Sequence, residues 1–275
     1  MYIRGNSMIG ITQSLTNPLA SIPLEASSIG ADTFQIFTRN PRTCRQRKSF
    51  DYELQGFNES LISSGIYKYV IHAPYCMNLA TDDTEARQRN INTIITDISQ
   101  MKRMAGVKYY VLHPGSHMYS PNWADNLMQT INGFYDEISD SDNIHVCFEM
   151  MSGKGSELLS NLDMIYWLLI QTRDLPNRGL CFDSCHVYAA GLPLVDTLKE
   201  LAPHVKVLHL NNSFGAAASH VDRHAPFDKG CIPIEELKGV FTAFNELCPQ
   251  STTVLETPTG TMLNDFDILN GWLKD

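Results

Sequence analysis

The residues of this chain best suited to chemistry are histidines and carboxylates that follow short apolar runs. Imidazole and carboxylate groups bind zinc, and manganese and iron accept them too. A single histidine in such a place is usually a partly buried structural residue, so it is the recurrence at six places that indicates a metal site. The six residues are His72, His113, Glu149, Asp183, His209 and Glu256.

Two short stretches add further candidate ligands. The segment GLCFDSCH (179–186) contributes His186, and HVDRH (220–224) contributes Asp222 and His224. Asp222 and His224 are two residues apart, so an extended backbone would point both side chains to one side. The thiols of Cys181 and Cys185 lie beside Asp183, but we interpret them as small hydrophobic groups and not as ligands.

The elements that must position these residues follow a repeated pattern. Apolar, β-branched runs alternate with longer segments of helical period, such as the face formed by Ile91, Ile94 and Ile98. Eight strand-then-helix units predict a (β/α)8 TIM barrel in a single domain, residues 1–275, with 1–7 as a short N-terminal extension. A doubly wound open sheet is the alternative. The predicted strands are 8–12, 33–38, 69–74, 110–115, 144–150, 179–184, 205–211 and 252–257.

A barrel would bring the candidate ligands together. The C-terminal ends of its parallel strands meet at one rim, where residues distant in sequence become neighbours. Six strand ends with His, Asp or Glu would place many polar groups in one pocket, which is costly unless cations neutralise them. The pattern therefore predicts a multinuclear metal centre.

Composition narrows the functional class. The longest apolar run, residues 164–170, is too short to cross a bilayer, and no leading signal segment is present, so we expect an intracellular protein. Seven cysteines without a CxxC pair predict reduced thiols in a reducing compartment; the cytoplasm, the nucleus and a viral setting all fit. The formal charge of −9 argues against a general nucleic-acid coat or a basic membrane-surface protein, but not against a local basic groove.

Seven short motifs, in order along the chain, resemble the endonuclease IV family. Members of this family are apurinic/apyrimidinic endonucleases that carry three zinc ions on a TIM barrel. One motif alone is weak evidence, but the ordered set is specific. The motifs are HAPY (72–75), LHPGSH (112–117), FE (148–149), CFDSCHVYAAG (181–191), HLN (209–211), VDRH (221–224) and LETP (255–258).

The resemblance implies a ligand set of nine residues for three zinc ions, with manganese possible at one site. His72 and His113 would hold one ion, and Glu149 would bridge it to a second. The remaining ligands of the second ion would be Asp183, His209 and Glu256, and those of the third would be His186, Asp222 and His224. Of these nine, Glu149, Asp183 and Glu256 are the expected catalytic residues.

The resemblance also implies the reaction. The substrate would be duplex DNA with an abasic site, cut on its 5′ side to leave a 3′ hydroxyl and a 5′ deoxyribose phosphate. A hydroxide bridging two zinc ions would attack the phosphorus, because the metals lower the pKa of water. A 3′-end-cleaning phosphodiesterase or phosphatase activity is expected as well, and a monomer is the expected state.

A basic loop is the expected DNA interface. The segment TRNPRTCRQRK (38–48) includes Arg39, Arg42 and Arg45, and such side chains supply much of the affinity for phosphates. In the resembled family, the loops after strands two and three enter the duplex, and Arg42 and Tyr75 stand at the matching positions, with Cys76 next to Tyr75 as a further expected DNA contact. A solvated charged loop is the alternative interpretation of the basic segment.

Three other functions compete with this one. A xylose-isomerase-like sugar isomerase or epimerase would use the same barrel with Glu149, Asp183, His209 and Glu256, but would not need the other five ligands. A protein that binds damaged DNA without cutting it would not need the full ligand set. An amidohydrolase is disfavoured because strand one has no His-x-His pair. The chain departs from the family pattern at Thr12, Met150, Asn212 and Phe214, which leaves loop details and substrate preference open.

Overall fold

Eight parallel strands close into a barrel in the computed structural model, which describes residues 8–14, 16, 18–138 and 143–274. The predicted TIM barrel is confirmed and the open sheet excluded; the predicted extension, residues 1–7, lies outside the described residues. Around the barrel the strand order is β1, β10, β7, β6, β5, β4, β3, β2. The strands are β1 (Met8–Thr12), β2 (Thr33–Phe37), β3 (Tyr69–His72), β4 (Val107–Leu112), β5 (His145–Glu149), β6 (Arg178–Asp183), β7 (Val205–Leu210) and β10 (Thr252–Leu255).

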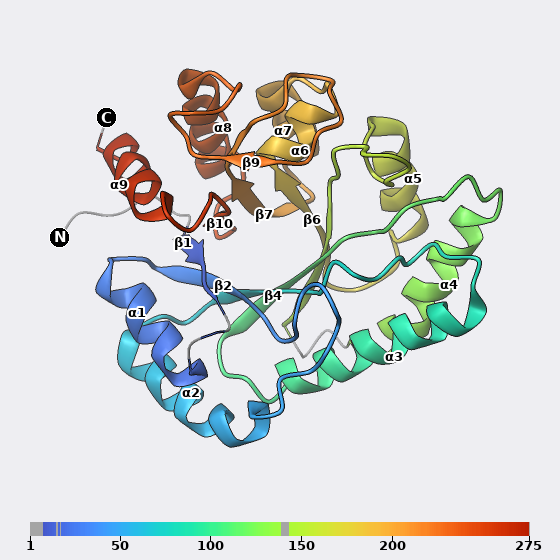
Figure 1. Ribbon diagram of the computed structural model, residues 1–275, viewed down its shortest axis with the longest axis horizontal. Helices are drawn as coiled ribbons and strands as arrows, with labels where there is room; N and C mark the ends of the chain where they lie inside the picture. The colour runs from blue at the N-terminus through green and yellow to red at the C-terminus, as the bar shows by residue number, and fades with distance from the viewer. Residues whose placement is uncertain (1–7, 15, 17, 139–142, 275) are drawn as a thin grey trace.

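Helices surround the strands (Figure 1). The predicted apolar face of Ile91, Ile94 and Ile98 is buried on α3. Among the described residues, none of the helices is long and apolar enough to span a membrane. The helices are η1 (Leu19–Ser21), α1 (Ile22–Ser28), α2 (Phe50–Ser64), α3 (Thr84–Met101), α4 (Trp123–Tyr135), α5 (Leu162–Gln171), α6 (Ser184–Ala189), α7 (Leu194–Leu201), α8 (Ile234–Leu247) and α9 (Met262–Trp272).

The barrel has a small apolar core of its own, separate from the larger core between strands and helices. Side chains alternate along each strand, so every second residue points into the barrel. Polar residues replace this core at the C-terminal ends of the strands, for example at Asp183, two residues after the buried Cys181. The inner core consists of Val70, Tyr109, Val111, Cys147, Cys181, Val207 and Val254.

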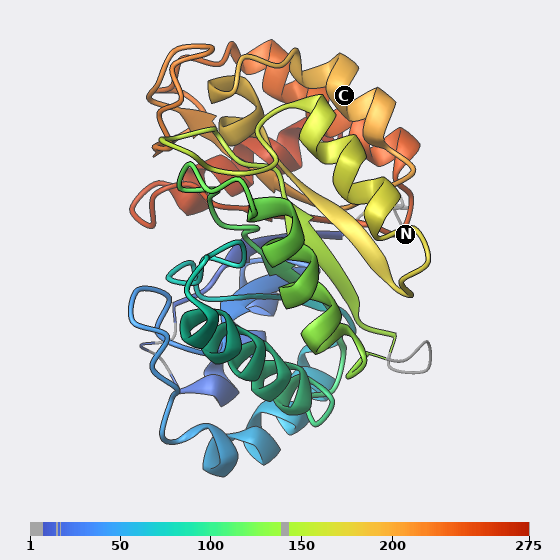
Figure 2. The same ribbon diagram turned by 90° about the vertical axis from the view of Figure 1, so that its right-hand side faces the viewer.

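Strand register brings two of the predicted ligands side by side. Asp183 on β6 is the Cα partner of His209 on β7. Loops from both halves of the chain gather along one side of the molecule, the left side in Figure 2. The barrel thus fixes the strand-borne ligands, while the loops must supply the rest.

One loop contains a short sheet that the sequence did not predict. Strand β8 (Asn212–Ser213) pairs antiparallel with β9 (His224–Ala225) after β7. Two backbone positions, Ser213 and His224, lie opposite each other in this pair. The pairing returns the HVDRH segment to the rim and holds His224 above the barrel.

Candidate metal centre

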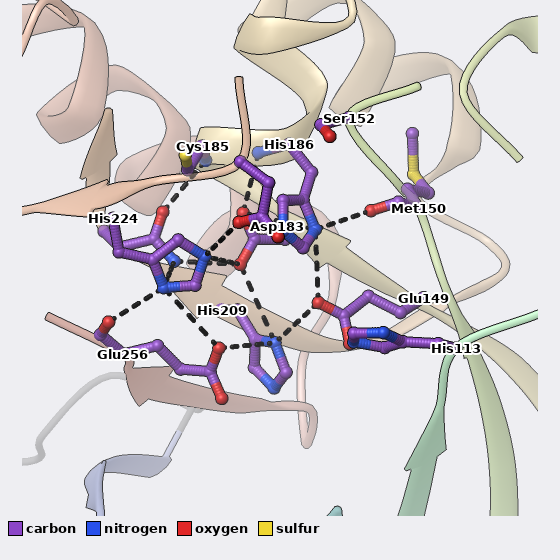
Figure 3. Close-up of polar contacts among 12 residues, drawn as sticks. His113, Glu149, Met150, Ser152, Asp183, Cys185, His186, His209, His224 and Glu256 are labelled. Atoms are coloured by element: carbon purple, nitrogen blue, oxygen red, sulfur yellow. Dashed lines mark hydrogen bonds and ion pairs between the residues drawn. The ribbon is translucent and has the colours of Figure 1, made fainter. Parts of the chain in front are cut away.

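Seven of the nine predicted ligands line one cavity at the C-terminal rim. The other two, Asp183 and His209, contact cavity-lining residues (Figure 3). The cavity has a volume of about 410 Å³. Among its lining residues are His72 from β3, Glu149 from β5 and Asp222 from the loop after β7. Residues far apart in the sequence, from His72 to Glu256, therefore meet in one place.

The first group of donors consists of His72, His113 and Glu149. The Oε2 atom of Glu149 lies 3.0 Å from His72 Nε2 and 3.1 Å from His113 Nε2. Their donor atoms are all within 4.8 Å of one another, a spacing that a single ion could span.

The second group surrounds His209. Its Nδ1 atom is 3.3 Å from Glu149 Oε1, 3.4 Å from Glu256 Oε2 and 3.8 Å from Asp183 Oδ2. Glu149 thus faces the first group with one oxygen and the second group with the other. This geometry is what a bridging carboxylate requires.

The third group contains His186, His224 and Asp222. His186 Nε2 lies 3.2 Å from Asp222 Oδ1, and His224 Nε2 lies 3.7 Å from both Asp222 Oδ1 and Asp183 Oδ2. The Nε2 atom of His224 is buried without a hydrogen-bond partner among the described residues. A buried, unpartnered imidazole nitrogen that faces two carboxylates fits a metal ion.

Hydrogen bonds on the outer side orient the imidazole rings. The Nδ1 atoms of His72, His186 and His224 lie 2.6, 3.1 and 3.0 Å from the backbone carbonyl oxygens of Ala73, Met150 and Glu256, respectively. When Nδ1 donates to a carbonyl, the lone pair is left on Nε2, which here points into the cavity. Such outer contacts fix the tautomer of metal-binding histidines.

Burial and charge give these groups abnormal proton affinities. Burial raises the pKa of Glu149, but the nearby His113 and His209 outweigh it and hold this pKa well below its usual range. A hydrogen bond from His186 lowers the pKa of Asp222 to about 2. The carboxylates of Glu149 and Asp222 are therefore ionised and available as ligands, and His209 and His186 carry protons that a metal would displace.

Two supporting residues were missed in the sequence. Gln35, fully buried in β2, accepts a hydrogen bond from His209 Nε2 at 2.9 Å and donates from Nε2 to Glu256 Oε1. Asn211 donates from Nδ2 to Asp183 Oδ2 at 2.8 Å and accepts the backbone N–H of Cys185 at 2.9 Å. The only sequence signals were a glutamine inside an apolar strand and the asparagine of the HLN motif.

Cys181 lies close to the second group, with its sulfur within 4.8 Å of donor atoms of Glu149 and His209. Burial, with the nearby Glu149 carboxylate, raises the pKa of its thiol. A protonated thiol in the apolar barrel interior agrees with its interpretation as a small hydrophobic group.

The predicted DNA-binding residues occupy different environments. Arg42 is exposed and donates from Nε to the hydroxyl oxygen of Tyr75 at 3.2 Å, which joins the loops after β2 and β3. Arg45 lines a second cavity of about 940 Å³ that shares His224 and Glu256 with the first. Arg39 instead is only 7% exposed and pairs with the buried Asp97 at 2.6 Å.

The cysteines require a correction. Cys44, in the loop after β2, forms a disulfide with Cys76, in the loop after β3. The expectation that all the cysteines are reduced is therefore wrong for these two, while the other five are free thiols. The sequence could not reveal the pair, because its members are 32 residues apart on separate loops that only the barrel brings together.

Comparisons with known proteins agree with the site. The model of the xylose isomerase-like TIM barrel family matches residues 23–264. A Finegoldia magna protein named "Probable endonuclease 4" is 34% identical over 267 residues, covering 94% of this chain and 92% of its own length. A Mycoplasmopsis pulmonis protein of the same name is 32% identical over 250 residues, covering 85% and 86%. Both relatives are bacterial and give no support to a nuclear or viral setting.

Solved structures also include an endonuclease IV among the proteins similar to this chain. The crystal structure of endonuclease IV from Thermus thermophilus superposes with a TM-score of 0.82 at 27% identity, covering 97% of this chain and 99% of that one. A D-tagatose 3-epimerase-like protein superposes with a TM-score of 0.74 at 20% identity, which shows the shared fold alone. The match of the family model and the sequence relatives at 34% and 32% identity show that this chain belongs to the endonuclease IV family of xylose isomerase-like TIM barrels.

Proposed function

We propose that this protein hydrolyses the phosphodiester bond on the 5′ side of an abasic site in duplex DNA, leaving a 3′ hydroxyl and a 5′ deoxyribose phosphate. The observation that carries the proposal is that seven of the nine predicted donors line one cavity, and that the other two, His209 and Asp183, contact them. Relatives named endonuclease 4, at 34% and 32% identity, support it. We propose that the protein acts as an intracellular monomer.

We infer that the site holds three zinc ions, with manganese possible at one position. Only nitrogen and oxygen atoms make up the three donor groups, which suits these metals. When bound, divalent ions would supply a hydroxide near neutral pH and would neutralise charge on the phosphate.

The protein's own residues would hold this arrangement in place. Glu149 faces both His72 and His209 with its two oxygens, so it would set the spacing of the first two positions. Asp183 lies between His209 and His224 and would connect the second group to the third. The carboxylate of Glu256 completes the second group.

The rim offers a surface for the DNA. We propose that Arg42 and Arg45 contact phosphates, and that Tyr75 enters the duplex beside an extruded abasic nucleotide, with the disulfide at Cys76 bracing its loop. Extruding a nucleotide costs least where the base is already missing, so the lesion itself favours recognition. Arg39, being buried against Asp97, would support the loop and not contact DNA directly.

The second candidate is a metal-dependent sugar isomerase or epimerase. The observation in its favour is that Glu149, Asp183, His209 and Glu256 alone form a four-donor group within 4.8 Å. Such an enzyme leaves His72, His113, His186, Asp222 and His224 without a role, although all five line the cavity of about 410 Å³. We therefore favour phosphodiester hydrolysis, which would extend to blocked 3′ ends at the same site.

The test is incubation of the zinc-loaded protein with a duplex that contains one abasic site. We expect a single nick 5′ to the lesion, with a 3′ end that a DNA polymerase extends. The same duplex without the lesion should stay intact, and a ketose such as fructose should not be epimerised. Epimerisation of the ketose without nicking would replace this proposal by the second candidate.

A further inference from the structure

The loop after β5 brings a lysine to the metal cavity. Lys154 lines the cavity of about 410 Å³ together with His113 and Asp222. It is the only lysine or arginine among the described residues that line this cavity. Its neighbours there include four carboxylates, those of Glu149, Glu157, Asp222 and Glu256.

The backbone of this loop is held in one conformation. Lys154 lies between Gly153 and Gly155, whose φ angles are +78° and +64°, values that favour glycine. The backbone N–H of Lys154 donates to Glu157 Oε2 at 3.0 Å, and Ser152 Oγ donates to the same oxygen at 2.9 Å. The turn is thus closed on itself, which fixes the point from which the lysine side chain extends.

Loops that carry metal ligands hold this turn from two sides. On one side, the backbone N–H of Leu158 donates to the carbonyl of Gly115 at 3.0 Å, and Gly115 comes two residues after His113. On the other side, His220, which comes two residues before Asp222, has its Nδ1 atom 2.8 Å from the Ser152 carbonyl oxygen. The position of Lys154 is therefore coupled to the first and third donor groups.

The ammonium group of Lys154 is available for a ligand. Its side chain is exposed, and Nζ has no hydrogen-bond or ion-pair partner within the part of the chain that the structure describes. The arginines of the basic loop follow β2, three strands away from β5 around the barrel. Lys154 thus supplies positive charge on a side of the cavity that the basic loop does not cover.

We propose that Lys154 binds a non-bridging oxygen of a substrate phosphate at the mouth of the metal cavity. The proposal rests on the proposed function, because it takes the substrate to be a phosphodiester. A phosphate that approaches four carboxylates needs cations around it, and an ammonium on a flexible stem serves as a point charge for such an oxygen. Lys154 would bind and orient the substrate without being a ligand of the metals.

The test compares Lys154→Met and Lys154→Arg with the wild type, with Lys199→Met on the exposed side of α7 as the matched control. Nicking of the abasic duplex is measured at several salt concentrations. Lys154→Met should raise KM about tenfold. It should also reduce the steepness of the plot of log affinity against log salt concentration, the salt slope, by about one, as expected for the loss of one phosphate contact. Lys154→Arg should restore most of the affinity, and Lys199→Met should change nothing. An unchanged KM and salt slope in Lys154→Met would overturn the proposal.

Two further measurements test the role of Lys154 separately from the proposed hydrolysis of abasic DNA. Zinc content should be the same in Lys154→Met as in the wild type, and loss of zinc would show that the lysine supports the metal site instead. Inorganic phosphate should bind the zinc-loaded wild type more tightly than Lys154→Met in calorimetry. If the wild type fails to nick abasic DNA, the proposed function fails, while the phosphate comparison still tests Lys154; equal phosphate binding would overturn its role as a phosphate ligand.

Discussion

The carboxylate of Asp183 accepts the backbone N–H of His186 through Oδ1 at 2.8 Å, while its Oδ2 faces His209 and His224. Asp183 is both the last residue of β6 and the N-cap of α6. A single side chain therefore begins the helix that carries His186 and lies between the second and third donor groups.

Because Asp183 both caps α6 and faces the donor groups, Asp183→Asn should affect fold stability and zinc binding to different degrees. Asparagine caps helices about as well as aspartate, so the fold should persist, but its amide loses the bond that Asp183 Oδ2 accepts from Asn211, which should cost about 1 to 3 kcal/mol of unfolding free energy in the metal-free protein. Loss of the charge should lower the zinc content of the purified protein and abolish most nicking. Thermal unfolding and elemental analysis of the same sample check both parts. A variant with full zinc content and full activity would show that Asp183 is not a ligand.

Gln35→Ala tests the residue that orients His209 and Glu256. Without the amide, His209 could place its proton on either nitrogen, and Glu256 would lose a donor. Zinc affinity should fall by about 10- to 100-fold, the usual effect of removing an outer contact of a metal site. Competition with a chromophoric chelator measures it. Thr12→Val, which removes only a 3.3 Å contact to Gln35 Nε2, should have a smaller effect; equal effects of the two variants would contradict the assignment.

Metal binding should compete with protons at His209. Burial lowers the pKa of this histidine, but the carboxylates of Glu256 and Glu149 outweigh burial and raise the pKa to about 9 in the metal-free protein. A raised histidine pKa stabilises the metal-free fold fully below about pH 6.5, the unfolded value, and this contribution is lost as the pH rises through about 9.

As the pH rises, zinc affinity should increase, whereas the stability that the protonated His209 gives to the metal-free fold decreases. The affinity should rise between pH 7 and pH 9 as the proton on His209 is removed, and each binding event should release protons near neutral pH. Calorimetry in buffers of different ionisation enthalpy counts those protons. Zinc affinity independent of pH across this interval, with no proton release, would contradict the assignment of His209 as a ligand.

The Cys44–Cys76 disulfide should matter for DNA binding more than for the metal centre. It joins the two loops that carry Arg42 and Tyr75, and its two cysteines are 32 residues apart in the sequence. Removing a crosslink of that span destabilises a fold by about 3 to 4 kcal/mol on the chain-entropy estimate.

The variant to examine is the double mutant Cys44→Ser, Cys76→Ser. Its affinity for an abasic duplex should fall because the loops lose their crosslink, while its zinc content stays at the wild-type level. The matched control is Cys231→Ser, which removes an exposed free thiol. If the double mutant binds DNA as tightly as the wild type, with or without reductant, the disulfide does not brace the interface.

The strand-end positions of the candidate ligands could be predicted because each follows a hydrophobic run whose length and β-branched content are typical of a strand. His72, Glu149 and Asp183 are examples, and the barrel then requires that they meet. Gln35 could not be predicted, since a polar residue inside a strand gives no sign of what it contacts. The disulfide and the β8–β9 pair depend on how loops approach one another, which local patterns do not encode.

Charge alone was also a poor guide to the interface. Arg39 and Arg42 belong to the same basic segment, yet one is buried against Asp97 and the other is exposed beside Tyr75. Lys154 lies in a glycine-flanked segment typical of a solvated loop, and only the fold shows that it lines the metal cavity. Which basic side chains face a ligand follows from tertiary packing.

The number of metal ions needed for nicking tests the central claim most directly. Protein stripped with a chelator is titrated with zinc, and nicking of a duplex with one abasic site is measured at each step. The three donor groups predict that activity rises until about three equivalents are bound, and elemental analysis should give the same number. Full nicking at one equivalent, or a protein that binds three ions and leaves the abasic duplex intact, would contradict the account.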